Sequence, residues 1–254
     1  MTDKPTRIVS FCLFGANEMY HNGMLANMHL CADLLPDWTV YCFMRPQNKW
    51  TDAEHATSHV LHDNGVEIIR VDSPDWSLPA WRFMAGNKLK GPQDVAIFRD
   101  ADSRINAREL AAMDEWLKIG YPFHVMRDHN RHNVPVLAGM WGVAGPSLRA
   151  IIGPMLQDWV RQCQEEVTAQ LMHAPSSKAE LAHALREKTR CFDQHFLTNA
   201  LWPIMADYTL AHTSQGFHHG EDDNRPFPEH GDMGASRFVG DIIEANGLAK
   251  EGLV

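Results

Sequence analysis

Two aspartates separated by one residue, Asp100 and Asp102, follow the apolar run at residues 95–98. In an extended chain the side chains of residues i and i+2 lie on the same side, so two such carboxylates can converge on one cation in the turn after a strand. Mg²⁺ and Mn²⁺ prefer oxygen ligands and are commonly held by one or two carboxylates together with substrate phosphates. The pair therefore predicts a divalent-metal site for a phosphorylated ligand. The alternative is that Asp102 and Ser103 only open the turn before the next helix.

The elements expected around this pair alternate between strands and helices. Apolar runs predict strands at residues 7–15, 39–44, 66–71 and 94–100. The spacing of apolar residues predicts helices at 22–37, 55–65 and 107–119, the last with Asn106 as its N-cap. Such alternation indicates a mostly parallel sheet covered by helices on both faces. Because ligands of these sheets bind beyond the carboxyl ends of the strands, Asp100 lies where a site is expected.

The second half of the chain combines shorter elements with many histidines. We expect a strand from Phe123, a polar loop and then a Gly- and Trp-containing segment up to Gly145. Helices are expected at 147–167, 176–188 and 193–205, with Pro203 ending the last, and a final strand at 208–212. The irregular tail from Thr213 is long enough to be functional. We therefore expect a single α/β domain over residues 1–254, with a nucleotide-binding half at about 1–120 and an acceptor-side half at about 121–254.

Composition narrows the classes of function. The formal net charge is -9 and the sequence has no run of Lys and Arg, which argues against a nucleic-acid-binding surface. No apolar run approaches the length of a transmembrane segment, and the N-terminus lacks the apolar core of a signal peptide. The five cysteines form no C-x-x-C pair, which predicts buried reduced thiols and a cytoplasmic location.

Several motifs follow one another along the chain: WRFM (81–84), VAIFRDADSR (95–104), FHVMRDHNRH (123–132), VLAGMWG (136–142) and CFDQHFLTNALWP (191–203). As an ordered set, with RIVSFCLFG at 7–15 and SRFVGDII at 236–243, they resemble a group of bacterial and viral glycosyltransferases with the GT-A fold. The resemblance covers most of the chain. It implies a GT-A-like, Rossmann-related sheet and an enzyme that takes a sugar from a nucleotide-diphosphate sugar. It also implies Mn²⁺ or Mg²⁺ on the Asp pair, and a glycan or lipid-linked sugar as acceptor.

The resemblance further implies residues on the donor side. The fold usually adds a later His or acidic metal ligand, for which His212 is the first candidate and His218 or His219 the second. Arg82 and Arg99 are candidate partners of the phosphates, or alternatively buried ion-pair partners of carboxylates. The predicted donor-binding residues, which include both arginines, are Phe14, Gly15, Asn17, Arg82, Arg99, Asp100, Ala101 and Asp102.

Sugar or acceptor binding is expected from a second group of side chains. Carboxylates and imidazoles suit sugar hydroxyls, Gly139 lets backbone approach a ligand closely, and Trp141 offers a flat face to a sugar ring. The alternatives are a hydrogen-bonded loop and a buried core tryptophan. The predicted residues are Arg127, Asp128, His129, His132, Gly139, Met140, Trp141, Gln194 and His218.

Asp193 is the predicted general base, because an inverting transfer needs a carboxylate to take the proton of the acceptor hydroxyl. It could equally cap the helix that follows. Two other functions remain open. A phosphohydrolase would use the Asp pair and the later histidines as a two-metal site and would need no acceptor. A non-catalytic carbohydrate-binding domain would bind sugar without any dependence on metal.

Overall fold

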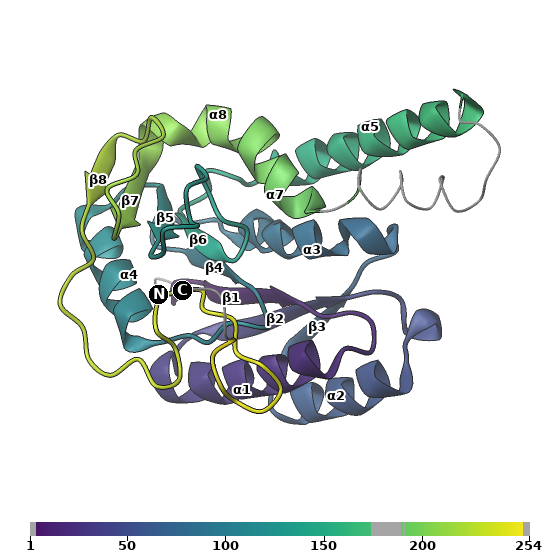
Figure 1. Ribbon diagram of the computed structural model, residues 1–254, viewed down its shortest axis with the longest axis horizontal. Coiled ribbons are helices and arrows are strands. Elements are labelled where there is room, and N and C mark those ends of the chain that lie inside the picture. The colour runs from purple at the N-terminus through teal and green to yellow at the C-terminus, as the bar shows by residue number, and fades with distance from the viewer. Residues whose placement is uncertain (1–3, 174–188, 190, 251–254) are drawn as a thin grey trace.

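The computed structural model describes residues 4–173, 189 and 191–250, and its strands form one sheet (Figure 1). The strand order is β3-β2-β1-β4-β6-β5-β7-β8. All neighbouring pairs are parallel except the pairs that β6 makes with β4 and β5. The predicted mostly parallel sheet is confirmed, and it includes strands from both halves of the chain. The strands are β1 (Arg7–Cys12), β2 (Thr39–Met44), β3 (Glu67–Arg70), β4 (Val95–Arg99), β5 (Phe123–Arg127), β6 (Met140–Ala144), β7 (Thr209–Thr213) and β8 (Asp223–Arg225).

Helices cover both faces of this sheet (Figure 1). In that view α1 and α2 lie below the sheet, whereas α3, α7 and α8 lie above it. None of the described helices is long and apolar enough to cross a membrane. The α-helices are α1 (Glu18–Leu34), α2 (Asp52–Asp63), α3 (Leu78–Trp81), α4 (Ala107–Ile119), α5 (Ile152–His173), α7 (Phe192–Phe196) and α8 (Trp202–Met205). The short 3-10 helices are η1 (Gln47–Lys49), η2 (Asp75–Ser77), η3 (Arg82–Lys88) and η5 (Ala206–Tyr208), and a π-helix, η4 (Leu197–Leu201), joins α7 to α8.

Side chains of the central strands alternate between two apolar cores. Ile8 and Phe98 belong to the core between the sheet and the η3–α5 face, whereas Val9 and Ile97 belong to the core between the sheet and the α1–α4 face. Successive residues of a strand point to opposite faces, so this alternation fixes the directions of the charged residues that follow. The last residue of β4, Arg99, accordingly faces α4, where it pairs with Glu109.

Within the described residues, the predicted helices and strands are present, with differences at their ends. Helix α1 begins at Glu18 because Asn17 caps it, its Oδ1 accepting from the Met19 amide at 3.1 Å. Helix α2 begins at Asp52, where Thr51 and Glu54 form a capping box. The helix predicted at 176–188 lies outside the described residues.

Two features of the second half differ from the prediction. The Gly- and Trp-containing segment forms β6, which inserts antiparallel between β4 and β5. Pro203 does not end a helix, because it lies in the first turn of α8, where a missing amide hydrogen costs little. Among the cysteines, Cys31 and Cys42 are buried free thiols as predicted, but Cys191 is an exposed one.

Candidate functional site

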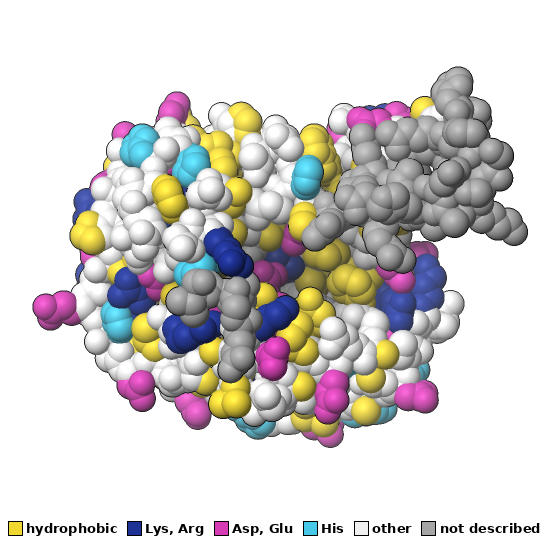
Figure 2. Space-filling view, viewed as in Figure 1, with side chains coloured by type: hydrophobic (Ala, Val, Ile, Leu, Met, Phe, Trp, Pro, Cys, Tyr) yellow, Lys and Arg dark blue, Asp and Glu magenta, His cyan; other side chains and the backbone are white. Residues whose placement is uncertain are grey.

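A cavity of about 480 Å³, here called the strand-end cavity, lies at the carboxyl ends of β1 and β4. The loop after β1, the turn after β4, the α3–η3 segment and the start of α7 contribute to its lining. The face drawn in Figure 2 is hollowed near its centre, where acidic and basic side chains lie together. The lining residues are Cys12, Leu13, Phe14, Gly15, Ala16, Asn17, Tyr20, Pro79, Arg82, Asp100, Ala101, Asp102 and Asp193.

This lining brings together most of the predicted donor side and the predicted base, from segments as distant in sequence as β1 and α7. Of the predicted donor and metal residues, Arg99 and the candidate metal ligands His212, His218 and His219 are missing from it. The sequence did not single out Cys12, Tyr20 or Pro79. The predicted residues in the lining are Phe14, Gly15, Asn17, Arg82, Asp100, Ala101, Asp102 and Asp193.

Arg82 holds two carboxylates together at the base of the cavity. Its side chain is 1% exposed, and its Nη2 lies 2.8 Å from Asp100 Oδ1 and 3.1 Å from Asp193 Oδ2. Its Nη1 lies 3.3 Å from the sulfur of Cys12. Burial disfavours the guanidinium charge, but the nearby carboxylates outweigh it and raise the pKa of Arg82 above its ordinary value. Arg82 is therefore a permanent buried cation shared by two acidic residues.

Asp100 and Asp102 are carboxylates whose negative charge is disfavoured. Burial raises the pKa of Asp100 although Arg82 opposes the shift and 45% of the side chain remains accessible. Burial and then the charge of Asp100 raise the pKa of Asp102 to about 7. An additional cation beside the pair would therefore be favourable.

Two residues of α1, one small and one polar, fix the turn that carries Asp100 and Asp102. Gly23 of α1 packs against the carbonyl of Ala101, and a Cβ at Gly23 would overlap that oxygen. Asn27, one helical turn later, donates from Nδ2 to the Ser103 carbonyl at 2.7 Å and accepts from the Ile105 amide at 3.2 Å. These residues were not predicted as site residues, although an isolated glycine inside a helical pattern is a usable signal of close packing.

Gly139 has a different role from the predicted one. It precedes β6 and packs against Asp100, so that a Cβ there would overlap Asp100 Oδ2 and lie 3.0 Å from the Asp100 amide nitrogen. The missing side chain thus makes room for a carboxylate of the protein, and not for backbone contact with a ligand.

We expect Gly139→Ala to displace the Asp100 carboxylate and weaken Mn²⁺ binding at least tenfold. The cost to the free energy of unfolding should be about 1–3 kcal/mol, the usual range for overpacking. Mn²⁺ affinity can be measured by electron paramagnetic resonance, with thermal unfolding of the same sample as the check on folding. Gly91→Ala is a suitable control, since Gly91 is not in the left-handed region and a Cβ there would come no closer than 3.7 Å to its nearest neighbours, the Asp94 carboxylate oxygens. Unchanged Mn²⁺ affinity in Gly139→Ala would contradict this role.

The residues present fit a divalent metal ion. Two carboxylates at the mouth of a turn, open to a cavity, are the usual protein contribution to a Mg²⁺ or Mn²⁺ site completed by phosphate oxygens and water. Within residues 4–173, 189 and 191–250, no three His, Cys, Asp or Glu side chains gather as a metal-binding group. Asp100 and Asp102, which both line the cavity, are the carboxylates that would hold such an ion.

His212 does not join the Asp pair, so its prediction as the third ligand is wrong. It lies on β7, and β6 and β5 separate that strand from β4. Its Nδ1 lies 2.7 Å from His124 Nε2, and its Nε2 lies 3.7 Å from Glu115 Oε2. The imidazole is fully buried and belongs to the packing between β5, β7 and α4.

Arg99 is not a phosphate partner. It is buried and forms an ion pair with Glu109 of α4, and its Nη1 donates to the Phe98 carbonyl at 2.7 Å. The alternative of a buried ion pair is the one that the structure supports, with Glu109 as the partner.

Trp141 and Met140 do not face the cavity. Trp141 is fully buried and packs against Phe83 and Phe98, with ring centroids 5.2 and 4.2 Å apart. Met140 is 4% exposed and packs against Gly240. The prediction that they contact a sugar is wrong, because the antiparallel insertion of β6 places both in the interior.

Arg127 and Asp128 are also structural. Arg127 is fully buried and pairs with Glu221 at 2.7 Å. Asp128 accepts from Arg108 Nε at 2.7 Å and Nη2 at 2.9 Å, and from the amide of Val239 at 2.9 Å. The prediction that Arg127 and Asp128 bind a sugar is wrong, because neither residue lines the cavity. Their charges instead contact residues of the C-terminal tail and hold it against the sheet.

Four other predicted residues lie outside the cavity lining. His129 stacks on Phe238 with centroids 4.5 Å apart, and the Nδ1 of His132 accepts from the Asp128 amide at 3.1 Å. His218 is exposed on the tail, where its Nδ1 accepts from the Gly220 amide. Gln194 joins α7 to the segment before β6, accepting from the Ala138 amide at 3.2 Å. Acceptor binding by these four residues stays a prediction.

The partly buried His132 gives the protein a testable dependence on pH. Burial lowers its pKa to about 4, below the ordinary 6.5, so the unfolded chain binds a proton more readily than the folded one between these values. His132 therefore stabilises the folded state above pH 6.5, and this contribution is lost as the pH falls toward 4.

We expect His132→Gln to reduce the loss of stability between pH 7 and pH 5 by about 2 kcal/mol relative to the unsubstituted chain. Urea unfolding at both pH values measures the difference, with His218→Gln as the exposed control. An equal loss of stability in His132→Gln and the unsubstituted chain would show that His132 does not titrate in this way.

Comparisons with known proteins give matches in structure only. No protein-family model matches the sequence, and no curated protein matches it either. One similar solved structure is a glycosyltransferase involved in glycosylation of the major capsid of PBCV-1, with 11% identity, 82% of each chain covered and a TM-score of 0.46. A second is the galactosyltransferase LgtC, solved with donor and acceptor sugar analogues, with 13% identity, 83% of this chain and 74% of that chain covered and a TM-score of 0.46. A third is residues 1–349 of S. aureus TarS, with 10% identity, coverage of 80% and 74%, and a TM-score of 0.39.

Proposed function

We propose that this chain is a metal-dependent glycosyltransferase that moves a sugar from a nucleotide-diphosphate sugar to a hydroxyl group of a glycan or related acceptor. One observation carries the proposal. The Asp100–Asp102 pair, the buried cation Arg82 and the carboxylate of Asp193 meet in one cavity at the carboxyl ends of parallel strands. In sheets of this type, that edge is where ligands bind.

The donor side of the cavity is suited to a nucleotide diphosphate. Phe14, Gly15 and Asn17 form the wall after β1, where the nucleoside would lie, and the Asp pair stands opposite after β4. A divalent ion held by Asp100 and Asp102 would neutralise the diphosphate as it leaves. Arg82 keeps Asp100 in place and adds a positive charge at the base of the same site.

Asp193 is the residue that we propose as general base. In the transfer, the bond between the anomeric carbon and the diphosphate oxygen breaks, the acceptor oxygen bonds to that carbon, and the hydroxyl proton passes to the Asp193 carboxylate. Its Oδ1 accepts from the Gln194 amide at 3.0 Å and its Oδ2 from Arg82, so its orientation is fixed on both sides. The helix begins at Phe192 with Cys191 as its N-cap, so the alternative role of Asp193 as the cap is not the one observed. With Asp193 as base, the proposal includes inversion at the anomeric carbon.

Asp193→Asn should retain donor binding and lower the rate of transfer by about 10²–10⁴, the range for removal of a general base. The asparagine oxygen can still accept from Arg82, so the fold should be maintained. Donor affinity by calorimetry and transfer rate by release of nucleoside diphosphate separate the two effects. Equal losses in both measurements would instead indicate that Asp193 positions the donor.

The phosphohydrolase alternative is tested by the identity of the bond that breaks. A glycosyltransferase releases nucleoside diphosphate from the donor, whereas a phosphohydrolase cleaves a P–O bond and releases a sugar phosphate or inorganic phosphate. Phosphorus NMR of a reaction with nucleotide sugars and Mn²⁺ distinguishes these products. The described histidines at 129, 132, 212 and 218 do not line the strand-end cavity, so no observation favours a two-metal site built with them. Sugar binding that is unaffected by a chelator would support the non-catalytic alternative.

A further inference from the structure

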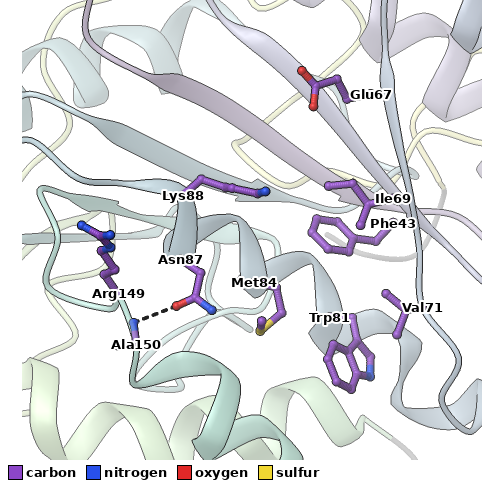
Figure 3. A pocket seen from close by; sticks show the side chains of 10 residues that line it. All are labelled: Phe43, Glu67, Ile69, Val71, Trp81, Met84, Asn87, Lys88, Arg149 and Ala150. Carbon is purple, nitrogen blue, oxygen red and sulfur yellow. Dashed lines mark hydrogen bonds between the residues drawn. The ribbon is translucent and has the colours of Figure 1, made fainter. Parts of the chain in front are cut away.

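A second hollow, of about 550 Å³, lies on the other side of the α3–η3 segment (Figure 3). We call it the edge groove, because β3, the edge strand of the sheet, contributes to its floor. The α3–η3 segment separates the two sites. Pro79 and Arg82 line the strand-end cavity, whereas Trp81 and Met84 line the edge groove. Its volume lies within the range of small-molecule sites.

One side of the edge groove is apolar. Phe43 of β2 and Ile69 of β3 form the floor, and Val71, Trp81 and Met84 extend it. In Figure 3 the Phe43, Ile69, Val71 and Trp81 side chains lie on the side away from Arg149. All but Phe43 are only partly buried, so this surface remains open to an apolar ligand.

Two cations also line the groove. Lys88 and Arg149 line the groove and are exposed, and within the described residues neither forms an ion pair. The acidic residue of the lining, Glu67, lies against the hydroxyl group of Tyr41. In a chain of net charge -9, two unpaired cations beside an apolar floor favour an anionic ligand.

The backbone of the turn that carries Arg149 is tied to the end of η3. The Ala150 amide donates to Asn87 Oδ1 at 2.9 Å, which ties the turn carrying Arg149 to the helix end carrying Lys88. Ala150 has a φ of +67°, a left-handed conformation that costs free energy in a residue with a side chain. This conformation is maintained in the turn beside Arg149, where the Ala150 backbone lines the groove.

We infer that the edge groove binds a single-chain amphiphile with a phosphate monoester headgroup. The alkyl chain would lie on Phe43, Ile69 and Trp81, and the phosphate would contact Lys88 and Arg149. This site is separate from the strand-end cavity and does not depend on the proposed transferase activity.

Calorimetric titration of the full chain with decyl phosphate, below its micelle concentration and without metal, tests the inference. We expect saturable 1:1 binding, no binding of inorganic phosphate, and at least tenfold weaker binding of decyltrimethylammonium. The double variant Lys88→Gln/Arg149→Gln should weaken decyl phosphate binding about tenfold, equivalent to about 1.4 kcal/mol. Both residues are exposed, so the variant should fold.

Two controls locate the ligand. Lys90→Gln removes a neighbouring exposed lysine that does not line the groove and should leave the affinity unchanged. Asp102→Asn alters the strand-end cavity and should also leave it unchanged. Val71→Asp places a negative charge on the apolar floor and should abolish binding. Absence of saturable binding, or equal affinity in the double variant and the unsubstituted chain, would overturn the inference.

Discussion

Asp102→Asn should abolish Mn²⁺-dependent binding of a nucleotide sugar and lower kcat/KM by about 10³-fold. The substitution keeps the size of the side chain but removes one of the two negative charges that would hold the ion. The metal's stabilisation of the leaving diphosphate is worth several kcal/mol, and each 1.36 kcal/mol corresponds to a factor of ten in rate. Calorimetry with and without Mn²⁺ and a transfer assay measure the two effects.

The same variant should unfold, in the absence of metal, at a temperature no lower than that of the unsubstituted chain. Burial and Asp100 raise the pKa of Asp102 to about 7, which means that its negative charge is unfavourable in the folded state. Asp114→Asn, on the exposed face of α4, is a matched control and should change neither property. Normal transfer by Asp102→Asn would remove the metal site from the proposal.

Arg82→Met should have the largest effect on stability among the substitutions at the site. Methionine fills a similar space but leaves Asp100 and Asp193 without their shared buried cation. Removing one partner of a buried ion pair costs about 3–5 kcal/mol. In a chain of this size, such a loss lowers the melting temperature by about 10 °C.

Arg82→Lys should recover part of that stability but little of the activity. A lysine keeps the charge, but it has no planar pair of nitrogens to contact Asp100, Asp193 and Cys12 together. Thermal unfolding and the transfer assay on both variants test this separation. A melting temperature of Arg82→Met equal to that of the unsubstituted chain would show that the two carboxylates do not depend on Arg82.

The local pattern of the sequence predicts the sheet and several of the residues that line the strand-end cavity. The run before Asp100 predicts β4 to within a residue at each end, and the alternation of elements predicts parallel pairing. The Asp100–Asp102 pair, Arg82 and Asp193 were identified by residue type and motif, and they do lie in one cavity. These features depend on short stretches of chain, and the sequence contains them directly.

The errors concern charged and aromatic residues next to buried strands. Arg99 and Arg127 resemble ligands in sequence, but each is neutralised by a distant carboxylate, Glu109 or Glu221. Trp141 was wrongly predicted to contact a sugar. The residues of β6 alone do not indicate that this strand inserts antiparallel beside β4. Identifying these partners requires long-range pairing, which a single sequence does not specify.

The most direct test is a calorimetric titration of the full chain with a panel of nucleotide-diphosphate sugars, with and without Mn²⁺. The proposal predicts that one donor binds at a single site and that a chelator abolishes this binding. It also predicts that the binding is absent in Asp102→Asn and maintained in Asp193→Asn. Absence of binding to every donor, together with phosphate release from a simple phosphate ester, would contradict it and support a phosphohydrolase.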